Sequence, residues 1–487
     1  MSEELLQRVK ELEEEVDRLK DQLRLNGEQQ QQQDEVKSRP DSTEGQTKES
    51  KPGVTTGGKK TKKQTKQRPF DFSSQPRRHV ALRLAYLGWG YQGFAVQDNT
   101  DSTVEARLFE ALLKTRLIQD RQTSNYHRCG RTDKGVSAFS QVITIDLRST
   151  QSSPGLGVTL PDQTQTGGTT TPAGRPELPY LKMLNRVLPQ DIRALDWAPA
   201  DHGFSARFDC QSRTYRYYFP RGALDVPLMA AAAQRYVGTH DYRNLCKMDV
   251  GNGVLKFQRT IVAASIRPVR QNATPGDPDR PRDPDDPNDL YDLFVFEIKG
   301  LAFLYHQVRC MMALLLLIGQ KLESPEIIDQ LLDVGSNPRK PQYSMAVDFP
   351  LVLYGCDFQG LAWQGGSDSS EEELQLVSAA LQQQWTRSAV ETQVLRGMLG
   401  GLEAMGAVPS KSCWLVEGSR QKNYRPLLER PCCESLESRI EHFVKRGRLE
   451  REEGENGGEA VHRGKRSKHS HGSAQPSDKT IDENVQN

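Results

Sequence analysis

The segment YHRCGRTDKGVSAF, residues 126–139, is the stretch around which the rest of the chain is organised. Two glycines, Gly130 and Gly135, bracket four polar or charged residues. Glycine adopts backbone angles that other residues resist, so we expect a tight, exposed loop here. The run QVITIDL, residues 141–147, follows and has the composition of a strand. The sequence therefore predicts a loop that leads into a strand.

The predicted loop carries one carboxylate, Asp133, among the cations Arg128, Arg131 and Lys134. Nearby positive charge lowers the pKa of an aspartate, so Asp133 is expected to be ionised at neutral pH. An ionised carboxylate suits a nucleophile or an electrostatic stabiliser, and the cations suit a phosphate-bearing substrate. The local chemistry leaves an alternative open, a surface turn in which Asp133 accepts a backbone N–H and the cations are solvated.

The wording RCGRTDKGVSA resembles the catalytic loop of the TruA family of tRNA pseudouridine synthases. Four further blocks resemble parts of that family and occur in its order: YLGWGYQGFAVQ, NRVLPQDIRALDW, FSARFDCQSRTYRYYF and FLYHQVRCMMALLLLIG. Together they span about residues 79–358. Among family members, these motifs are most similar to those of the eukaryotic enzymes that modify positions 38 and 39 of the tRNA anticodon arm.

The resemblance implies an isomerase that breaks the bond between uracil N1 and ribose C1′, turns the base and rejoins it through C5. It implies that tRNA is the partner, that the protein is a homodimer, and that no metal or nucleotide cofactor takes part. It also implies a role for each of four residues: Asp133 as nucleophile, Tyr215 against the target base, Arg131 in the space left by the flipped base, and Arg309 paired with Asp133.

The residue types support parts of that assignment. The ring of Tyr215 can stack on uracil and its hydroxyl can handle a proton at C5, although a strand aromatic in the core is the alternative. Arg309 lies on a mostly apolar predicted helix, where a buried guanidinium needs an anionic partner unless its stem reaches solvent. His306, three residues before Arg309, is expected to be a core or rim histidine rather than a catalyst.

Two other patterns receive interpretations of their own. The segment GWGYQG at residues 88–93 has the glycine spacing of the dinucleotide-binding motif G-x-G-x-x-G. We reject that function, because tryptophan and tyrosine stand where a pyrophosphate needs close backbone approach and no helix opens there. A helix is instead predicted after Ser102 or Thr103, with Glu105 as the capping-box partner of Ser102.

Composition limits the remaining possibilities. The net charge is only +1, and the eight cysteines and nine histidines show no spacing typical of a zinc site. The longest apolar run, residues 310–318, is far shorter than the roughly 20 residues of a membrane span, so no span is expected. Basic clusters at 59–68 and 465–468 indicate a nuclear location, with a cytoplasmic pool as the alternative, although many such runs are merely solvated tails.

The predicted fold class is α+β. The resemblance implies two pseudo-symmetric ferredoxin-like halves that share a central antiparallel sheet and enclose a basic cleft. The predicted parts are a coiled-coil-like helix at 1–26, a disordered basic and polar linker at 27–69, a core at 70–360 with halves at about 79–200 and 201–360, a helical extension at 361–453, and a disordered tail at 454–487.

Two other functional classes compete with the isomerase. A catalytically silent tRNA-binding module of the same fold is the first, but Asp133, Tyr215 and Arg309 are all present, which favours an enzyme. A nucleoside or glycoside hydrolase shares the chemistry of attack at an anomeric carbon. That class usually needs two cooperating carboxylates, and the loop supplies one.

Overall fold

The computed structural model describes residues 70–161, 176–269, 290–364, 368–408, 414–416, 424–447, 449–451 and 460–462 of the 487-residue chain. The chain divides into two units, Met1–Pro69 and Phe70–Asn487, and the description below concerns the second. The predicted coiled-coil-like helix at 1–26 and the predicted linker at 27–69 lie outside the described residues.

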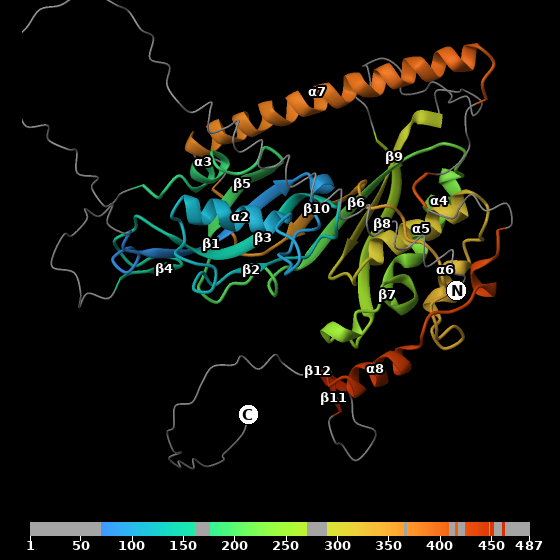
Figure 1. Ribbon diagram of the computed structural model, residues 1–487, viewed down its shortest axis with the longest axis horizontal. Helices are drawn as coiled ribbons and strands as arrows, with labels where there is room; N and C mark the ends of the chain where they lie inside the picture. The colour runs from blue at the N-terminus through green and yellow to red at the C-terminus, as the bar shows by residue number, and fades with distance from the viewer. Residues whose placement is uncertain are drawn as a thin grey trace, which may run out of the picture. The chain divides into compact units, whose positions relative to one another are not determined.

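A single large sheet forms the centre of this unit (Figure 1). Eight strands follow one another across it in the order β4-β1-β3-β10-β6-β9-β8-β7, while β2 pairs with β3 and β5 pairs with β1. Their bounds are β1 Arg77–Tyr86, β2 His127–Arg128, β3 Ser137–Arg148, β4 Val158–Thr159, β5 Ile192–Pro199, β6 Ser212–Pro220, β7 Gly238–Asp241, β8 Gln258–Pro268, β9 Leu293–Gly300 and β10 Leu351–Asp357.

The pairing of β3 with β10 joins the two parts of the sheet, and it is parallel. Val352 lies opposite Ser137, and Leu353 lies opposite Ala138. Every other pair in this sheet is antiparallel, so the sheet is mixed where the resemblance implied an antiparallel one. The physical reason is that no hairpin ties β10 to β3, so the direction of that pairing is not imposed by a tight turn.

Most of the described helices contribute residues to one of two hydrophobic clusters. Their bounds are α2 Val104–Lys114, α3 Tyr180–Asn185, α4 Val226–Ala233, α5 Gln307–Gly319, α6 Ile327–Leu332, α7 Asp368–Ala404 and α8 Leu436–Lys445. Residues of α2 and α3 join β1, β3 and β5 in one cluster, and residues of α4, α5 and α6 join β6, β8 and β9 in the other. Tyr215 packs against both clusters, which places it at the junction.

Helix α5 is buried along its entire length, because every one of its residues from Gln307 to Gly319 is buried. A helix that is apolar all round is stable only inside a core, so its single cation, Arg309, is forced into that environment. Among the helices that the structure describes, none combines the length and apolar composition needed to cross a membrane.

The start of α2 differs from the predicted capping box. Thr103 is the N-cap residue, and its side chain accepts a hydrogen bond from the backbone N–H of Ala106 at 3.3 Å. Glu105 cannot serve Ser102, because its buried carboxylate instead accepts the backbone N–H of Val96 at 2.8 Å and pairs with two arginines.

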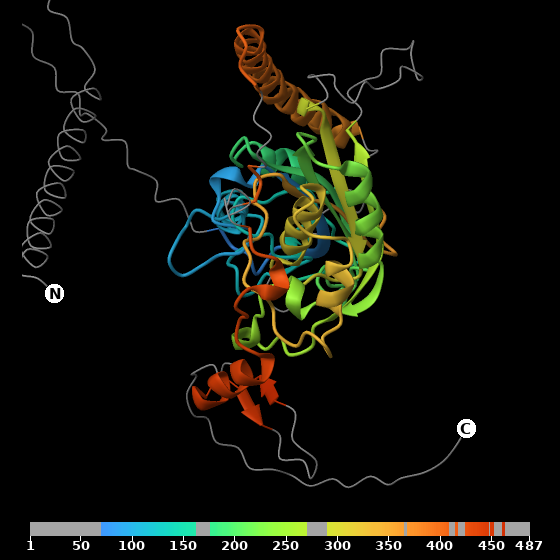
Figure 2. The same ribbon diagram turned by 90° about the vertical axis from the view of Figure 1, so that its right-hand side faces the viewer.

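The C-terminal extension returns to the core. Val416 bridges Ala346, Cys432 bridges Pro341, and Leu427 is fully buried in the cluster that surrounds α5. Helix α8 contacts β11 (Leu449–Arg451), which pairs with β12 (Ala460–His462) in a small red unit in Figure 2. The tail predicted to be disordered from residue 454 thus contains a strand, and its remaining residues lie outside the described part.

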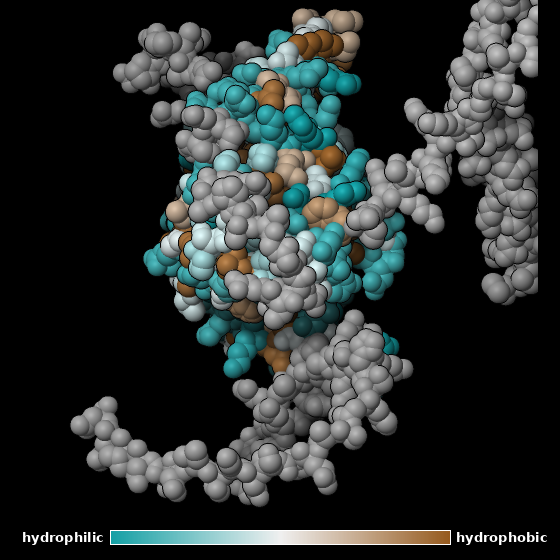
Figure 3. All heavy atoms as spheres, turned by 90° about the vertical axis from the view of Figure 1, so that its left-hand side faces the viewer, coloured by the Kyte–Doolittle hydropathy of each residue, from teal (hydrophilic) through white to brown (hydrophobic). Residues whose placement is uncertain are grey.

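The face drawn in Figure 3 is mainly hydrophilic, with apolar residues scattered rather than gathered into one broad patch. Scattered apolar residues are normal on a solvated surface.

Candidate active site

Two backbone hydrogen bonds hold the loop around Asp133. The N–H of Phe94 donates to the carbonyl of Thr132 at 3.1 Å, and the N–H of Gly135 donates to the carbonyl of Tyr91 at 3.2 Å. The residues on both sides of Asp133 are therefore fixed to the segment that follows β1, which restricts the directions in which the carboxylate can point.

The glycines of GWGYQG serve this contact. A Cβ on Gly88 would lie 2.0 Å from the carbonyl oxygen of Val136, and one on Gly93 would lie 3.1 Å from that of Thr132. Gly93 also has a φ of +112°, which side chains other than glycine rarely adopt. The segment forms the short 3₁₀ turn Gly88–Gly90 rather than a nucleotide-binding helix start. The glycine pattern thus lets two backbone segments meet beside Asp133.

The Asp133 carboxylate lies in a largely desolvated position, with only 18% of its side chain exposed. Burial raises its pKa to about 6, although the positive charges of Arg309 and Lys247 oppose the rise and the negative charge of Asp348 adds to it. The expectation of a lowered pKa is therefore wrong, because desolvation outweighs the cations. The carboxylate is still mostly ionised above pH 7.

The cations of the loop itself lie elsewhere. Arg128 donates to the carboxylate of Glu105 at 2.5 Å, while Arg131 and Lys134 are exposed. Desolvation of its guanidinium, together with the positive charges of Arg128 and Arg207, lowers the pKa of Arg131. They form a cationic rim beside the loop instead of a cage around Asp133.

Arg309 does not pair directly with Asp133 as the resemblance implied. Its Nε donates to the carbonyl of Ala346 at 2.8 Å, and its Nη2 lies 3.9 Å from Oδ2 of Asp348. Its charge nevertheless lowers the pKa of Asp133. The direct pair is absent because the chain just before β10 brings Asp348 closer to the guanidinium, and nothing in the sequence reveals that approach.

His306 is the residue nearest to Asp133 that the sequence interpretation underrated. Its Nε2 lies 3.6 Å from Oδ2 of Asp133, and its φ of +61° is unusual for a residue other than glycine. Burial and the charges of Arg309, Lys247 and Lys340 lower its pKa to about 4, so the ring is neutral at pH 7. The signal available in the sequence was its place three residues before Arg309.

Tyr215 lies on β6 between Leu353 of β10 and Ile298 of β9. Its ring meets that of Phe303 edge to face, with the ring centres 5.1 Å apart. Burial raises the pKa of Tyr215 well above its usual value, and the charge of Asp133 contributes to the rise. The phenol is therefore protonated at neutral pH and lies close enough to Asp133 to sense its charge.

The chain is similar in sequence to known tRNA pseudouridine synthases. Residues 232–359 match the family model described as tRNA pseudouridine synthase. A human protein named tRNA pseudouridine(38/39) synthase is 49% identical over 471 residues, which cover 92% of this chain and 89% of that protein. The Saccharomyces cerevisiae protein of the same name is 40% identical over 312 residues, which cover 62% of this chain and 63% of that protein. A tRNA pseudouridine synthase A from Thermococcus onnurineus is 26% identical over 319 residues, which cover 66% of this chain and 99% of that protein.

This chain belongs to the TruA family of tRNA pseudouridine synthases.

The synthase has a basic pocket beside the Asp133 loop. Its volume is about 480 Å³, and its lining includes the cationic side chains of Lys247, Arg309, Lys340 and Arg439 together with His306. No acidic residue is among the described residues that line it. Such a pocket suits the phosphates of an RNA strand. Arg439 comes from α8 and donates to the carbonyl of Met248 at 3.0 Å, so the C-terminal extension contributes to the site.

The structure therefore brings together three of the four predicted site residues. The charge of Arg309 lowers the pKa of Asp133 and the charge of Asp133 helps to raise the pKa of Tyr215, whereas Arg131 is exposed on the loop. Sequence reasoning missed Lys247 and Asp348, both of which act on the pKa of Asp133. Neither lies in a block that the family resemblance singled out for catalysis, so no sequence signal marked them.

Proposed function

We propose that this synthase converts uridine to pseudouridine at positions 38 and 39 of the tRNA anticodon arm, with Asp133 as its nucleophile. The observation that carries the proposal is the state of Asp133, a desolvated carboxylate of pKa about 6 that two backbone contacts hold in place. The 49% identity to a human protein named for those two positions supports the choice of uridines.

The proposed reaction needs no oxidant, reductant or added group. The bond between N1 and C1′ breaks, the uracil turns, and a bond forms between C5 and C1′. The C5 proton leaves and N1 gains a proton, so the product is an isomer of the substrate. Attack of Asp133 on C1′ and attack on C6 of the base are both open routes, and both require the ionised carboxylate.

The neighbours of Asp133 have complementary roles in this proposal. The positive charge of Arg309 favours the ionised form of the Asp133 carboxylate. His306 lies beside the carboxylate and is neutral, so it adds no further positive charge. The protonated phenol of Tyr215 presents its ring to the flipped uracil, where stacking is favourable. A proton-accepting role for Tyr215 is disfavoured while its pKa is raised.

The cationic residues divide into two groups in this proposal. Arg131, with Arg128 and Arg207 nearby, contacts the RNA beside the loop and fills the space that the flipped base leaves. The pocket that contains Lys247 and Lys340 holds phosphates next to the target nucleotide. Both groups contact the RNA backbone or the space that the flipped base leaves in the base stack. Neither group therefore recognises the identity of the base by itself.

The finer architecture is also a proposal. Two ferredoxin-like halves related by pseudo-symmetry would explain why the hydrophobic residues fall into two clusters and why only the β3–β10 pair connects the antiparallel parts. The basic cleft would lie at their junction. We further propose a homodimer, an N-terminal coiled coil, and a nuclear location, on the basis of the leucine and valine spacing and the basic clusters in the sequence.

The test uses an unmodified tRNA transcript with uridine at both positions and the full-length protein. Pseudouridine should form at positions 38 and 39, and replacing either uridine with cytidine should abolish the product at that position alone. The Asp133→Asn protein should bind the transcript within several-fold of the wild type without forming product. Binding by the wild type without product would indicate the silent RNA-binding module, and release of free uracil would indicate a hydrolase.

A further inference from the structure

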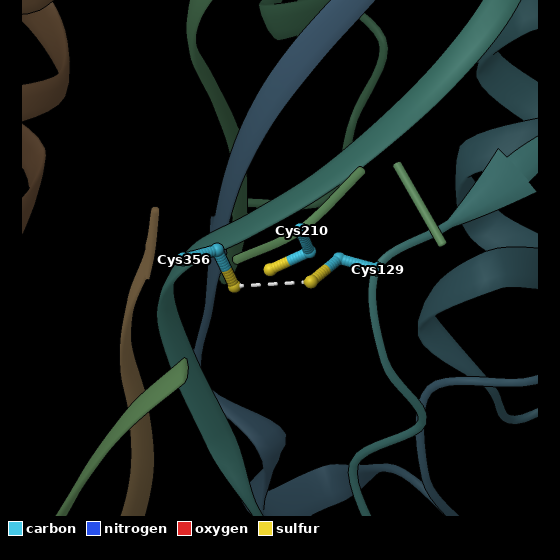
Figure 4. A group of neighbouring side chains, drawn as sticks. All are labelled: Cys129, Cys210 and Cys356. Atoms are coloured by element: carbon cyan, nitrogen blue, oxygen red, sulfur yellow. Dashed lines mark hydrogen bonds between the residues drawn. The ribbon is translucent and has the colours of Figure 1, made fainter. Parts of the chain in front are cut away.

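Three cysteine sulfurs converge behind the catalytic loop (Figure 4). Cys129 follows β2, Cys210 precedes β6, and Cys356 lies on β10, so the three come from distant parts of the sequence. Their Sγ atoms all lie within 4.8 Å of one another, and those of Cys129 and Cys356 are 3.3 Å apart. Figure 4 shows all three side chains pointing toward a common centre.

A positive charge accompanies these sulfurs. The guanidinium of Arg213 donates to the carbonyls of Cys129 and Cys210, at 3.1 Å and 3.3 Å. Ordinary packing of cysteine as a small apolar residue requires neither the charge nor the convergence.

We propose that Cys129, Cys210 and Cys356 form a binding site for one zinc ion. Each thiol loses its proton on binding, so three Zn–S bonds form and three protons are released. A zinc ion with three thiolates carries one net negative charge, and the adjacent Arg213 offsets it, which limits the cost of burying the site. A monovalent ion such as Cu(I) would leave a second negative charge without compensation.

A zinc ion that lies about 2.3 Å from each of three sulfurs requires those sulfurs to be close together without being bonded to one another, as these three are. Zinc is usually four-coordinate, and three protein ligands leave one position for water or another small ligand. A disulfide between Cys129 and Cys356 is the competing outcome. It would use two sulfurs and leave the convergence of Cys210 unexplained.

The site would act on the position of the catalytic residues. Cys129 lies four residues before Asp133, and Cys356 lies on β10, whose Leu353 pairs with Tyr215. Zinc would therefore tie the start of the catalytic loop to the strands that carry Tyr215. No sequence pattern indicates such a site, because metal-binding cysteines are recognised by short spacings and these three are brought together only by the sheet.

The first test uses the full-length wild-type protein, reduced and freed of metal. Titration with Co(II) should produce a thiolate charge-transfer band that saturates at one ion per chain and disappears when Zn(II) is added. X-ray absorption of the zinc-loaded protein should show three sulfur neighbours at about 2.3 Å. Zinc should also slow hydrogen exchange in the loop that contains Asp133. A zinc environment of oxygen and nitrogen alone would overturn the proposal.

The second test compares two buried cysteines. Cys210→Ser should abolish the cobalt band, whereas Cys246→Ser should retain it, because Cys246 is equally enclosed but outside the group. Circular dichroism establishes that each variant is folded. A band that survives in folded Cys210→Ser protein overturns the proposal, as does a Cys129–Cys356 disulfide in freshly purified protein that binds no metal after reduction. If Cys210→Ser does not fold, the absorption measurement on the wild type decides.

Discussion

The guanidinium of Arg309 lies 3.9 Å from the carboxylate of Asp348, and the two side chains influence Asp133 in opposite directions. The arginine charge lowers the pKa of Asp133 and the aspartate charge raises it. Burial is the largest influence and leaves the pKa at about 6. The ionisation of the proposed nucleophile is therefore set by desolvation and adjusted by an ion pair beside it.

This relationship predicts opposite shifts in the pH profile of kcat/KM. The wild-type rate should rise with pH through about 6, because the ionised form of Asp133 is the reactive one. Arg309→Met should move this rise upward by about one pH unit, which lowers the ionised fraction of Asp133 and reduces activity about twofold at pH 7 and up to about tenfold below pH 6. Arg309→Lys keeps the charge but loses the planar fork, so partial activity is expected.

Asp348→Asn is the matched variant, since it removes the negative member of the same pair. Its pH profile should move downward, with activity at pH 6 closer to the maximum than in the wild type. The rate is measured on one tRNA transcript across pH 5 to 9, with folding checked at each end. Shifts of both variants in the same direction would contradict the electrostatic account.

Asp133→Asn should be inactive and yet more stable at neutral pH. The pKa is raised from 3.8 to about 6 on folding, so the ionised carboxylate destabilises the folded state above pH 6. The gain from the substitution should be at most about 3 kcal/mol at pH 8, decline as pH falls through 6, and disappear below about pH 4. Urea unfolding of both proteins at pH 4 and pH 8 measures it, and an equal or lower stability of the variant at pH 8 would count against a desolvated Asp133.

Gly88→Ala should reduce activity by orders of magnitude. The added Cβ would lie 2.0 Å from the carbonyl oxygen of Val136, so the catalytic loop must move away from the segment after β1. A 1 Å displacement of reacting groups is enough to cost about a hundredfold in rate. Gly90→Ala is the control, because a Cβ there meets no described atom within 4 Å. Similar activity in the two variants would show that close approach at Gly88 is unimportant.

Glu105→Gln should destabilise the fold. The Glu105 side chain is 1% exposed and pairs with Arg121 and Arg128, at 2.8 Å and 2.5 Å. Because both arginines retain some access to solvent, we expect a loss of about 2 kcal/mol, below the usual cost of breaking a fully buried pair. The pKa of Glu105 is lowered, so this stabilisation exists above about pH 4.5 and is lost as pH falls below it.

The neighbouring exposed pair provides the comparison for Glu105. Glu110 lies 2.9 Å from Arg107, and its side chain is 65% exposed. Glu110→Gln should cost less than about 1 kcal/mol, as exposed ion pairs usually do. Urea unfolding at pH 7 measures both changes, and equal losses would mean that the burial of Glu105 is not what makes its pairs important.

The sequence predicted the strand after the Asp133 loop and the helices that carry Glu105 and Arg309, because their patterns are local. The helical extension predicted at 361–453 contains the helix Asp368–Ala404, and the predicted helix that carries Arg309 is present as Gln307–Gly319. The family assignment is confirmed by the comparisons. These predictions were correct because they rest on hydrophobic periodicity or on contiguous motifs, both of which can be read from the sequence without the fold.

The predictions about the site were wrong where residues that are distant in the sequence interact with the same charged side chain. Glu105 binds Arg128 and removes it from the surroundings of Asp133, while Asp348 takes the direct contact with Arg309. The direction of the Asp133 pKa was wrong because burial depends on the packed fold. Local sequence patterns also did not indicate that the C-terminal extension packs against the core through Leu427 and Arg439.

The most direct test of the central claim is the release of hydrogen from C5 of uridine. A tRNA transcript labelled with tritium at C5 is incubated with the wild type or with Asp133→Asn, and tritium in water is compared with pseudouridine formed. The account predicts one tritium released for each pseudouridine by the wild type, no release of free uracil, and neither product with Asp133→Asn. Tritium release by folded Asp133→Asn protein at a rate near that of the wild type would contradict the assignment of Asp133 as the nucleophile.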